Sequence, residues 1–139
     1  MRFSGKVVRV GRFWHIEVPD LNVRTQGHTK KEAYEMIADA IESLVDRDGF
    51  QVGVYPGHGD YFEIDANDQA TLFAFFLRQQ RESSGVRLTE AARRLGQSSP
   101  NAYARYEQGK SVPTIAKLDE LLAAVGTGKF VLRRSELDD

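Results

Sequence analysis

The N-terminal half of the chain alternates apolar and polar residues at the period of a β-strand. Residues 2–19 are rich in β-branched and aromatic residues on both sides of Gly11, and a Pro-Asp pair ends the run. We therefore expect two strands joined at Gly11, followed by a third short strand over about 21–26. Because side chains two positions apart lie on the same side of a strand, the second strand has a predicted core face. That face consists of Trp14, Ile16 and Val18.

A helical period replaces this alternation near Thr29. Thr29 and Glu32 have the spacing of a capping box, in which the hydroxyl accepts from the backbone near Glu32 and the carboxylate reaches back to Thr29. Strand-like runs return at 50–55 and 61–65, separated by the turn-forming sequence PGHGD. The helix that precedes them should cover the sheet with an apolar stripe and expose its acidic side. The stripe consists of Ala33, Ile37, Ala40, Ile41 and Leu44.

The C-terminal half has a helical period throughout. We predict helices at 67–85, 88–95 and 100–108, and a last helix that begins at the cap residue Thr114. The first of these helices is apolar on nearly all sides, which is typical of a helix that is fully buried or lies between two domains or subunits. The inward residues expected on the three later helices are Leu88, Ala91 and Leu95, then Tyr103 and Tyr106, and finally Ile115, Leu118, Leu121, Leu122 and Val125.

Chain length and the change of period define the domain organisation. A chain of 139 residues suits one ordinary domain or two small ones. The change from strand to helix periods near residue 67 favours two domains, at 1–66 and 67–139, and an α+β fold class. Domains this small are expected to rely on partners or on oligomerisation.

Composition excludes several classes of site. The sequence contains no cysteine, so disulfides, thiolate zinc sites and cysteine nucleophiles are impossible. No stretch approaches the roughly 20 apolar residues of a membrane span, and the N-terminus lacks the apolar run of a signal peptide. We therefore expect a cytoplasmic protein without a membrane partner.

The histidines and carboxylates form no recognisable catalytic or metal site. No two of His15, His28 and His58 have the spacing that places two zinc ligands on one face of an element. An active two-metal nuclease, which is the enzyme alternative, needs several carboxylates near shared ions at neighbouring strand ends. The first strand carries none, and Glu17 lies in the second. We expect no enzyme activity, no metal and no cofactor.

A net charge of −1 conceals an uneven distribution of charge. Residues 1–67 carry 8 Lys and Arg against 11 Asp and Glu, whereas residues 68–139 carry 11 against 9. Within 78–117, eight basic residues accompany three acidic ones, a net charge of +5. Such a basic segment is typical of a nucleic-acid-binding module, and the alternative is a set of solvated helix faces.

The sequence YEQGKSVPT at 106–114 follows two short helices that contain Ala92 and Gly96, and this arrangement resembles the XRE (lambda-repressor/Cro-like) helix-turn-helix domains. The resemblance spans about 68–125 and implies that the helix at 100–108 is a recognition helix for the major groove of DNA. One departure is a turn after Gly96 that is one residue longer than the commonest turn in these domains. Another is Arg87, which stands near a position where Gln or Thr often holds a phosphate.

The resemblance also assigns roles to single residues. Asn101, Ala102 and Arg105 fall where base edges are contacted, and Asn and Arg bond adenine and guanine bidentately. It further implies a buried ion pair between Arg81 and Glu107. From the sequence itself, Ser99 is expected to cap the recognition helix, with Pro100 at its first position. The complete set of expected DNA-binding residues is Arg87, Ser98, Ser99, Pro100, Asn101, Ala102, Arg105, Lys110 and Ser111, with Arg93 also near the phosphates.

The N-terminal half resembles the N-terminal domain of HicB-type antitoxins. The likeness rests on VPDL at 18–21, TQGHTKKEA at 25–33 and the order of elements, and it covers about 2–65. It implies a truncated ribonuclease H-like β-β-β-α-β fold without nuclease activity that binds HicA, a small ribonuclease toxin. An exposed aromatic residue beside charged residues suits an interface. The candidate toxin-binding residues are accordingly Phe13, His15 and Glu17.

Together the two resemblances imply an antitoxin that neutralises a HicA-like ribonuclease toxin and represses its own operon. The expected partners are the toxin, operator DNA with an inverted repeat, and further copies of the chain in a homodimer or homotetramer. A strand at 129–133 is one candidate contact between copies. The alternative function is a one-component transcription factor whose N-terminal domain senses a ligand or only dimerises.

Overall fold

The computed structural model describes residues 1–126 and 128–137, which form two compact units. The sheet unit comprises Met1–Gln69 and the segment from Arg133 onward, and the helical unit comprises Ala70–Leu132. The helical unit begins at Ala70, whereas the predicted domain boundary lies after residue 66. The expected assignment of 133–137 to the helical domain is corrected by the structure, because this segment belongs to the sheet unit. Residues 138 and 139 lie outside the described residues.

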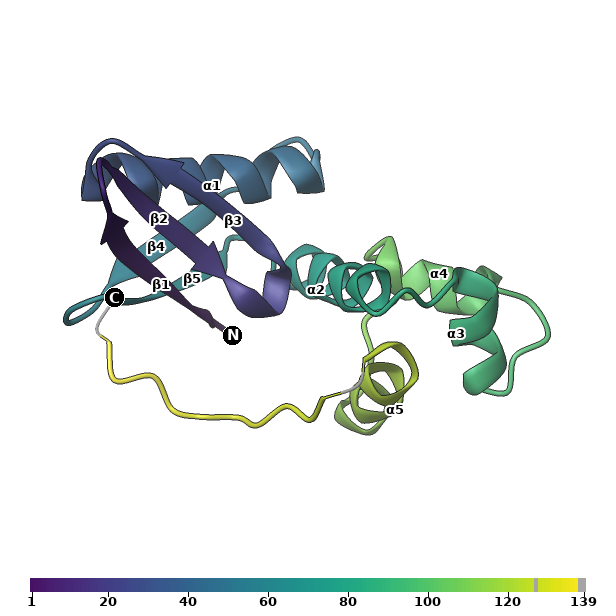
Figure 1. Cartoon of the computed structure of the whole chain (residues 1–139). Helices are drawn as coiled ribbons and strands as arrows, with labels where there is room; N and C mark the ends of the chain where they lie inside the picture. The colour runs from purple at the N-terminus through teal and green to yellow at the C-terminus, as the bar shows by residue number, and fades with distance from the viewer. Residues whose placement is uncertain (127, 138–139) are drawn as a thin grey trace. The chain divides into compact units, whose positions relative to one another are not determined.

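Five antiparallel strands form the sheet of the sheet unit. They are β1 (Phe3–Val10), β2 (Phe13–Val18), β3 (Val23–Gly27), β4 (Val52–Pro56) and β5 (Tyr61–Ala66). Their order in the sheet is β3-β2-β1-β5-β4 (Figure 1). The order β-β-β-α-β implied by the resemblance has one strand too few, because the PGHGD turn reverses the chain and pairs β4 with β5. As a result β5 is the strand that lies beside β1.

Helix α1 (Lys30–Val45) covers one face of this sheet (Figure 1). The Thr29 hydroxyl accepts a hydrogen bond from the Glu32 N–H at 3.0 Å, as predicted. The second bond of the expected capping box is wrong in detail, because the Glu32 carboxylate accepts from the His28 N–H at 3.2 Å and not from Thr29. The cap nevertheless satisfies two backbone donors at the start of the helix.

The sheet and α1 enclose the core of the sheet unit. Ile16 and Val18 are buried as predicted, whereas Trp14 is only half-buried. Leu44 was expected in the apolar stripe of α1, but it is 50% exposed. Leu44 lies seven residues after Ile37, about 20° away around the helix, so it is on the same face as the buried residues but in the last turn of α1. The buried residues on this face are Ala33, Ile37 and Ile41.

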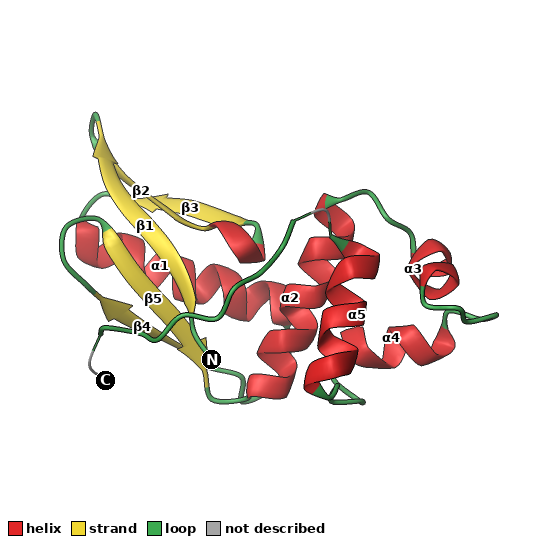
Figure 2. Cartoon of the chain, turned by 90° about the horizontal axis from the view of Figure 1, so that it is seen from below, coloured by secondary structure: helices red, strands yellow, loops and turns green. Residues whose placement is uncertain are grey.

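The C-terminal segment lies on the face of the sheet opposite α1, and Figure 2 shows it crossing this side of the strands. The Ser135 hydroxyl donates to the Glu63 carboxylate at 2.5 Å, and the Arg133 guanidinium donates to the Tyr61 hydroxyl at 2.7 Å. The described residues from 128 to 137 contain no strand, so the strand expected at 129–133 does not form within this chain.

The helical unit contains α2 (Gln69–Ser83), α3 (Leu88–Arg94), α4 (Asn101–Glu107) and α5 (Ile115–Val125). All residues from 71 to 77 in α2 are buried, as its uniformly apolar surface predicts. Among the described residues, no helix is long and apolar enough to cross a membrane.

The expected inward residues of the helical unit are only partly correct. Tyr103 has no exposed surface, and Leu121 and Val125 are likewise fully buried. Leu88 is 36% exposed and Ile115 is 87% exposed, so the expectation is wrong for both. Each is the first residue of its helix, and the helical period cannot show where packing against the core begins.

Candidate nucleic-acid interface

The loop at 95–100 sets the angle between α3 and α4. Gly96 has a φ of 76°, a left-handed conformation that glycine adopts without strain. The Gln97 N–H donates to the Ala92 carbonyl at 2.9 Å, and the Gly96 N–H donates to the Arg93 carbonyl at 3.0 Å. These two bonds form a Schellman motif, which ends α3 sharply and turns the chain toward α4.

Helix α4 begins on a serine and a proline. The Ser99 hydroxyl accepts a hydrogen bond from the Asn101 N–H at 3.2 Å, and the Pro100 carbonyl accepts from the Ala104 N–H at 2.8 Å. The cap residue of α4 is therefore Pro100, and the predicted serine cap with proline at the first helical position is one residue too early. The Ser99 hydroxyl instead binds the backbone of the first helical residue. The first exposed turn of α4 therefore has a fixed start.

The end of α4 repeats the motif that ends α3. Gly109 has a φ of 71°, and the Lys110 N–H donates to the Arg105 carbonyl at 2.9 Å. The Ser111 N–H reaches the same carbonyl at 3.3 Å. Lys110 and Ser111 are thereby held against the last turn of the helix.

The inner side of α4 is fixed by a buried ion pair. Arg81 of α2 donates to Glu107 through Nε at 2.6 Å and Nη2 at 3.0 Å, a bidentate arrangement. The two side chains are 12% and 7% exposed. Arg81 also donates to the Val86 carbonyl at 3.0 Å, and the Tyr103 hydroxyl donates to Glu107. The ion pair implied by the resemblance is therefore present, with a tyrosine and a backbone carbonyl joined to it.

This network shifts the pKa of its members. Hydrogen bonds to Glu107 raise the pKa of Arg81. Burial and the hydrogen bond to Glu107 raise the pKa of Tyr103 far above its ordinary value. Both groups keep their protons at neutral pH, so the network retains its donors under physiological conditions.

The outer side of α4 carries the residues expected to read bases. Asn101, Ala102 and Arg105 are exposed, while Tyr103 lies on the buried side of the same seven-residue helix. An exposed amide and an exposed guanidinium on the first two turns of a helix suit base edges in a major groove.

Three of the expected DNA-binding cations have no carboxylate partner among the described residues. Arg87, Arg105 and Lys110 are exposed, and none of them forms an ion pair in the described part of the chain. Their charges are available for phosphates or bases. The other expected residues of this surface, Ser98, Ser99, Pro100 and Ser111, are exposed or half-exposed.

Arg93 and Arg94 differ from these cations because Glu90 binds both. Arg93 donates to Glu90 at 2.8 and 2.5 Å, and Arg94 donates to it at 3.1 Å. The two arginines lower the pKa of Glu90 to about 2. Arg94 also donates to the Ala124 carbonyl at 2.9 Å, which links α3 to α5. The i,i+3 and i,i+4 spacing of Glu90 to the arginines was a sequence signal for this pairing.

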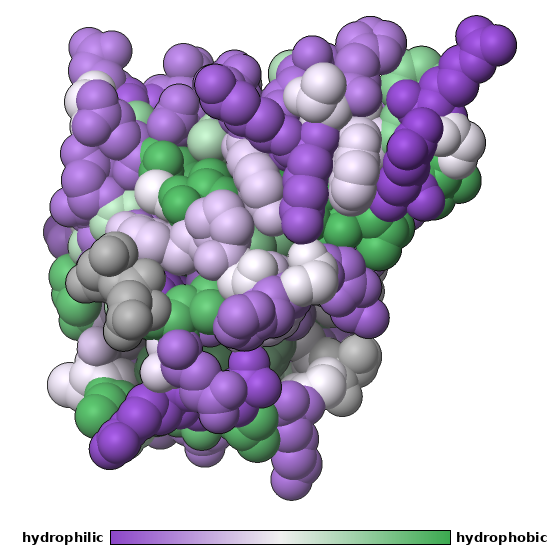
Figure 3. Space-filling view, turned by 90° about the vertical axis from the view of Figure 1, so that its left-hand side faces the viewer, coloured by the Kyte–Doolittle hydropathy of each residue, from purple (hydrophilic) through white to green (hydrophobic). Residues whose placement is uncertain are grey.

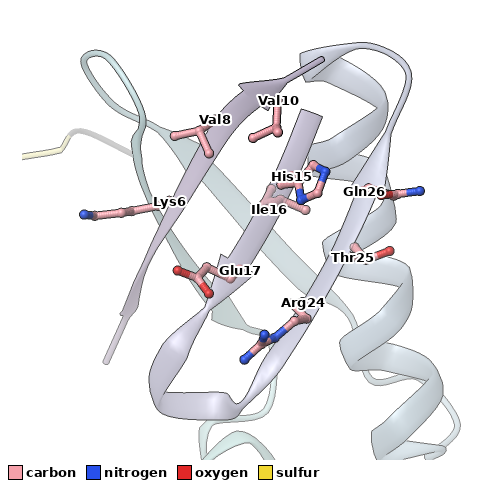
Figure 4. A pocket seen from close by; sticks show the side chains of 9 residues that line it. All are labelled: Lys6, Val8, Val10, His15, Ile16, Glu17, Arg24, Thr25 and Gln26. Atoms are coloured by element: carbon pink, nitrogen blue, oxygen red, sulfur yellow. The ribbon is translucent and has the colours of Figure 1, made fainter. Parts of the chain in front are cut away.

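A second candidate surface lies on the outer face of the sheet. A hollow of about 500 Å³ is lined by residues of β1, β2 and β3 (Figure 4). Lys6, Glu17 and Arg24 lie directly opposite one another in the register of these strands. Val8 and Val10 beside them are 39% and 55% exposed.

The three candidate toxin-binding residues differ in their position on this face. His15 and Glu17 line the hollow. Phe13 does not line it, and its ring packs against the His28 ring at a centroid distance of 5.2 Å. Sequence reasoning missed Lys6 and Arg24, because their position opposite Glu17 depends on strand register.

Hydrophilic side chains predominate on the face of the molecule in Figure 3, with apolar side chains in small groups between them. Among the described residues, no three His, Asp or Glu side chains gather as metal ligands.

Comparison with known protein families finds a match for the helical unit. Residues 72–134 match the family model of a helix-turn-helix domain. No curated protein matches the chain. The match covers α3 and α4, the loop between them, the following helix α5, and α2 from its fourth residue onward. The match supports a helix-turn-helix domain of the DNA-binding, XRE-like kind at residues 72–134.

Proposed function

We propose that the chain is a HicB-like antitoxin that represses its own operon through the helix-turn-helix domain and neutralises a HicA-like ribonuclease toxin through the sheet unit. The observation that carries the DNA-binding part is the exposed side of α4, with Asn101 and Arg105 outward and the helix fixed from within by Arg81 and Glu107. The proposal places the protein in the cytoplasm and assigns it no catalysed reaction and no cofactor.

DNA binding by this chain is expected to need two copies of the domain. One seven-residue helix reaches only a few base edges. Specific affinity of about 10⁻⁸ M or better generally requires two half-sites about 34–36 Å apart. The operator is therefore an inverted repeat bound by a homodimer or by two dimers in a tetramer.

Substitution of two cations separates base reading from phosphate binding. Arg105→Ala is expected to lose about 1–3 kcal/mol of discrimination at one position of each half-site. Lys110→Ala is expected to weaken binding to all sequences and to lower the salt slope by about 1. Footprinting and salt titration with the full chain measure both effects.

Lys117→Ala is the matched control for these variants, because Lys117 lies on α5 and pairs with Glu120 at 3.3 Å. It should leave operator binding unchanged. Protection of one unsymmetrical half-site by a monomer contradicts the dimer, and no protection upstream of the chain's own gene contradicts autoregulation.

The toxin-binding part of the proposal is supported by the N-terminal resemblance and by the outer sheet face. Its charged row and exposed valines give the mixture of apolar centre and charged rim that suits a protein partner. The rival, a one-component transcription factor, needs no partner at this face. An adjacent gene for a protein of about 60 residues favours the antitoxin.

Charge reversal on the sheet face is expected to abolish neutralisation but not DNA binding. The variant His15→Ala with Glu17→Lys removes one charge and adds its opposite within the hollow, so a partner's cation meets a like charge. Co-expression with the toxin and a growth assay measure the loss. Glu35→Lys on the exposed side of α1 is the control. Full neutralisation by the double variant contradicts this binding face.

A further inference from the structure

The C-terminal segment, residues 133–137, is held on the sheet by a polar cradle that consists of Arg2, Tyr61 and Glu63. Glu63 is 4% exposed and accepts hydrogen bonds from Tyr61 at 2.5 Å, from Ser135 at 2.5 Å and from Arg2 at 3.2 Å. Arg2 also donates to the Leu137 carbonyl at 3.3 Å. The segment thus supplies a hydroxyl and a carbonyl to the cradle.

The cradle is electrostatically adapted to this segment. Burial alone would raise the pKa of Glu63, but hydrogen bonds from Ser135, Tyr61 and Arg2 outweigh it and hold the pKa below its ordinary value. Arg133 adds a second cation, which donates to the Tyr61 hydroxyl at 2.7 Å. A buried carboxylate with three donors is stable only while those donors remain in place.

The residues that lead into the segment have a different character. The Phe130 ring packs against the Phe76 ring of the helical unit at a centroid distance of 5.2 Å. The next two residues, Val131 and Leu132, are 88% and 94% exposed. They form neither helix nor strand. The chain that leads into the docked segment therefore exposes two consecutive large apolar side chains to water.

We propose that residues 133–137 are exchanged between two copies of the chain, so that the segment of one copy docks in the cradle of the other. Exchange preserves every hydrogen bond of the cradle, because the exchanged segment is chemically identical. It also brings two copies of the Val131–Leu132 connection together, where they bury each other's apolar side chains. The second copy then contributes Arg133 and Ser135 to a site that is incomplete without them.

The exchanged dimer goes beyond the proposed function and is independent of what the dimer binds. It supplies the pairing of helix-turn-helix domains that an inverted repeat requires. Arg105→Ala weakens operator reading and leaves the exchange intact, so failure of DNA binding and failure of the exchange are separate results.

A mixing experiment tests the exchange. One chain carries Arg2→Ala and Glu63→Gln, which disable the cradle but leave the C-terminal segment intact. The other chain ends at Leu132, which removes the segment but leaves the cradle intact. The two chains differ in mass, so native mass spectrometry identifies each dimer in the mixture. Thermal unfolding of each chain checks that it is folded.

The expected result is that the unmodified chain is dimeric, that each altered chain alone is monomeric, and that their mixture forms the heterodimer. Dimers of either altered chain alone overturn the proposal. A mixture that stays monomeric also overturns it, as does an unmodified chain that is monomeric.

A second pair of variants with smaller changes tests the exchange in case the first two altered chains do not fold. Tyr61→Phe removes the acceptor for Arg133 in one chain, and Ser135→Ala removes the donor to Glu63 in the other. Each alone is expected to weaken the homodimer, because both of its cradles are impaired. Dilution measurements of the dimer dissociation constant detect the loss. Homodimers of both variants as tight as that of the unmodified chain overturn the exchange.

Discussion

Replacing Arg81 with methionine is expected to lower the free energy of unfolding by about 3–5 kcal/mol. The substitution leaves Glu107 buried, 7% exposed, without its bidentate partner. Tyr103 still donates to Glu107, but one neutral donor does not compensate a buried carboxylate. Thermal or denaturant unfolding of the full chain measures the change.

Arg93→Met is the matched control for this substitution. Arg93 also pairs with a glutamate, but its side chain is 72% exposed, and exposed pairs contribute about 0–1 kcal/mol. If Arg81→Met costs no more than Arg93→Met, the buried network does not stabilise α4, and the fixed recognition helix in the proposed function loses its support.

Replacing Phe62 with alanine is expected to cost about 3–5 kcal/mol in the sheet unit. Phe62 has no exposed surface and packs edge-on against the Tyr34 ring at 5.6 Å. Gly5 on the neighbouring strand makes room for it, because a Cβ at position 5 would lie 2.3 Å from Phe62 Cζ. A packed ring of this kind leaves a cavity when it is removed.

Phe130→Ala is the control for this substitution, because the Phe130 ring is 37% exposed. Its removal should cost clearly less than that of Phe62. Equal losses of stability in the two variants would contradict the assignment of Phe62 to the core.

Local sequence determined the ends of the helices. Thr29 and Thr114 cap their helices through bonds to residues three positions on, and Gly96 and Gly109 end theirs. The side chain and the backbone group that meet in such a cap are near neighbours in the chain, so no tertiary contact is needed to bring them together. For this reason the elements of both halves could be predicted from the sequence.

The spacing of residues also determined which side of α4 faces outward. Tyr103 and Glu107 are four apart and lie inward, so Asn101 and Arg105 fall on the other side. The pairing of Arg93 and Arg94 with Glu90 was equally accessible from the spacing, whereas the bond from Arg94 to the Ala124 carbonyl was not.

Only the tertiary structure decided which side chains from distant parts of the chain contact one another on the sheet. Arg2, Glu63 and Ser135 are separated by more than 60 residues, and no short-range period relates them. Lys6, Glu17 and Arg24 became one row only through strand register, which pairing between β1, β2 and β3 sets. The helical period correctly showed that Leu44 and Ile115 lie on the apolar stripes of their helices, yet both are exposed. Burial depends on whether another helix or strand packs against that turn, and the period of one helix carries no information about its packing partner.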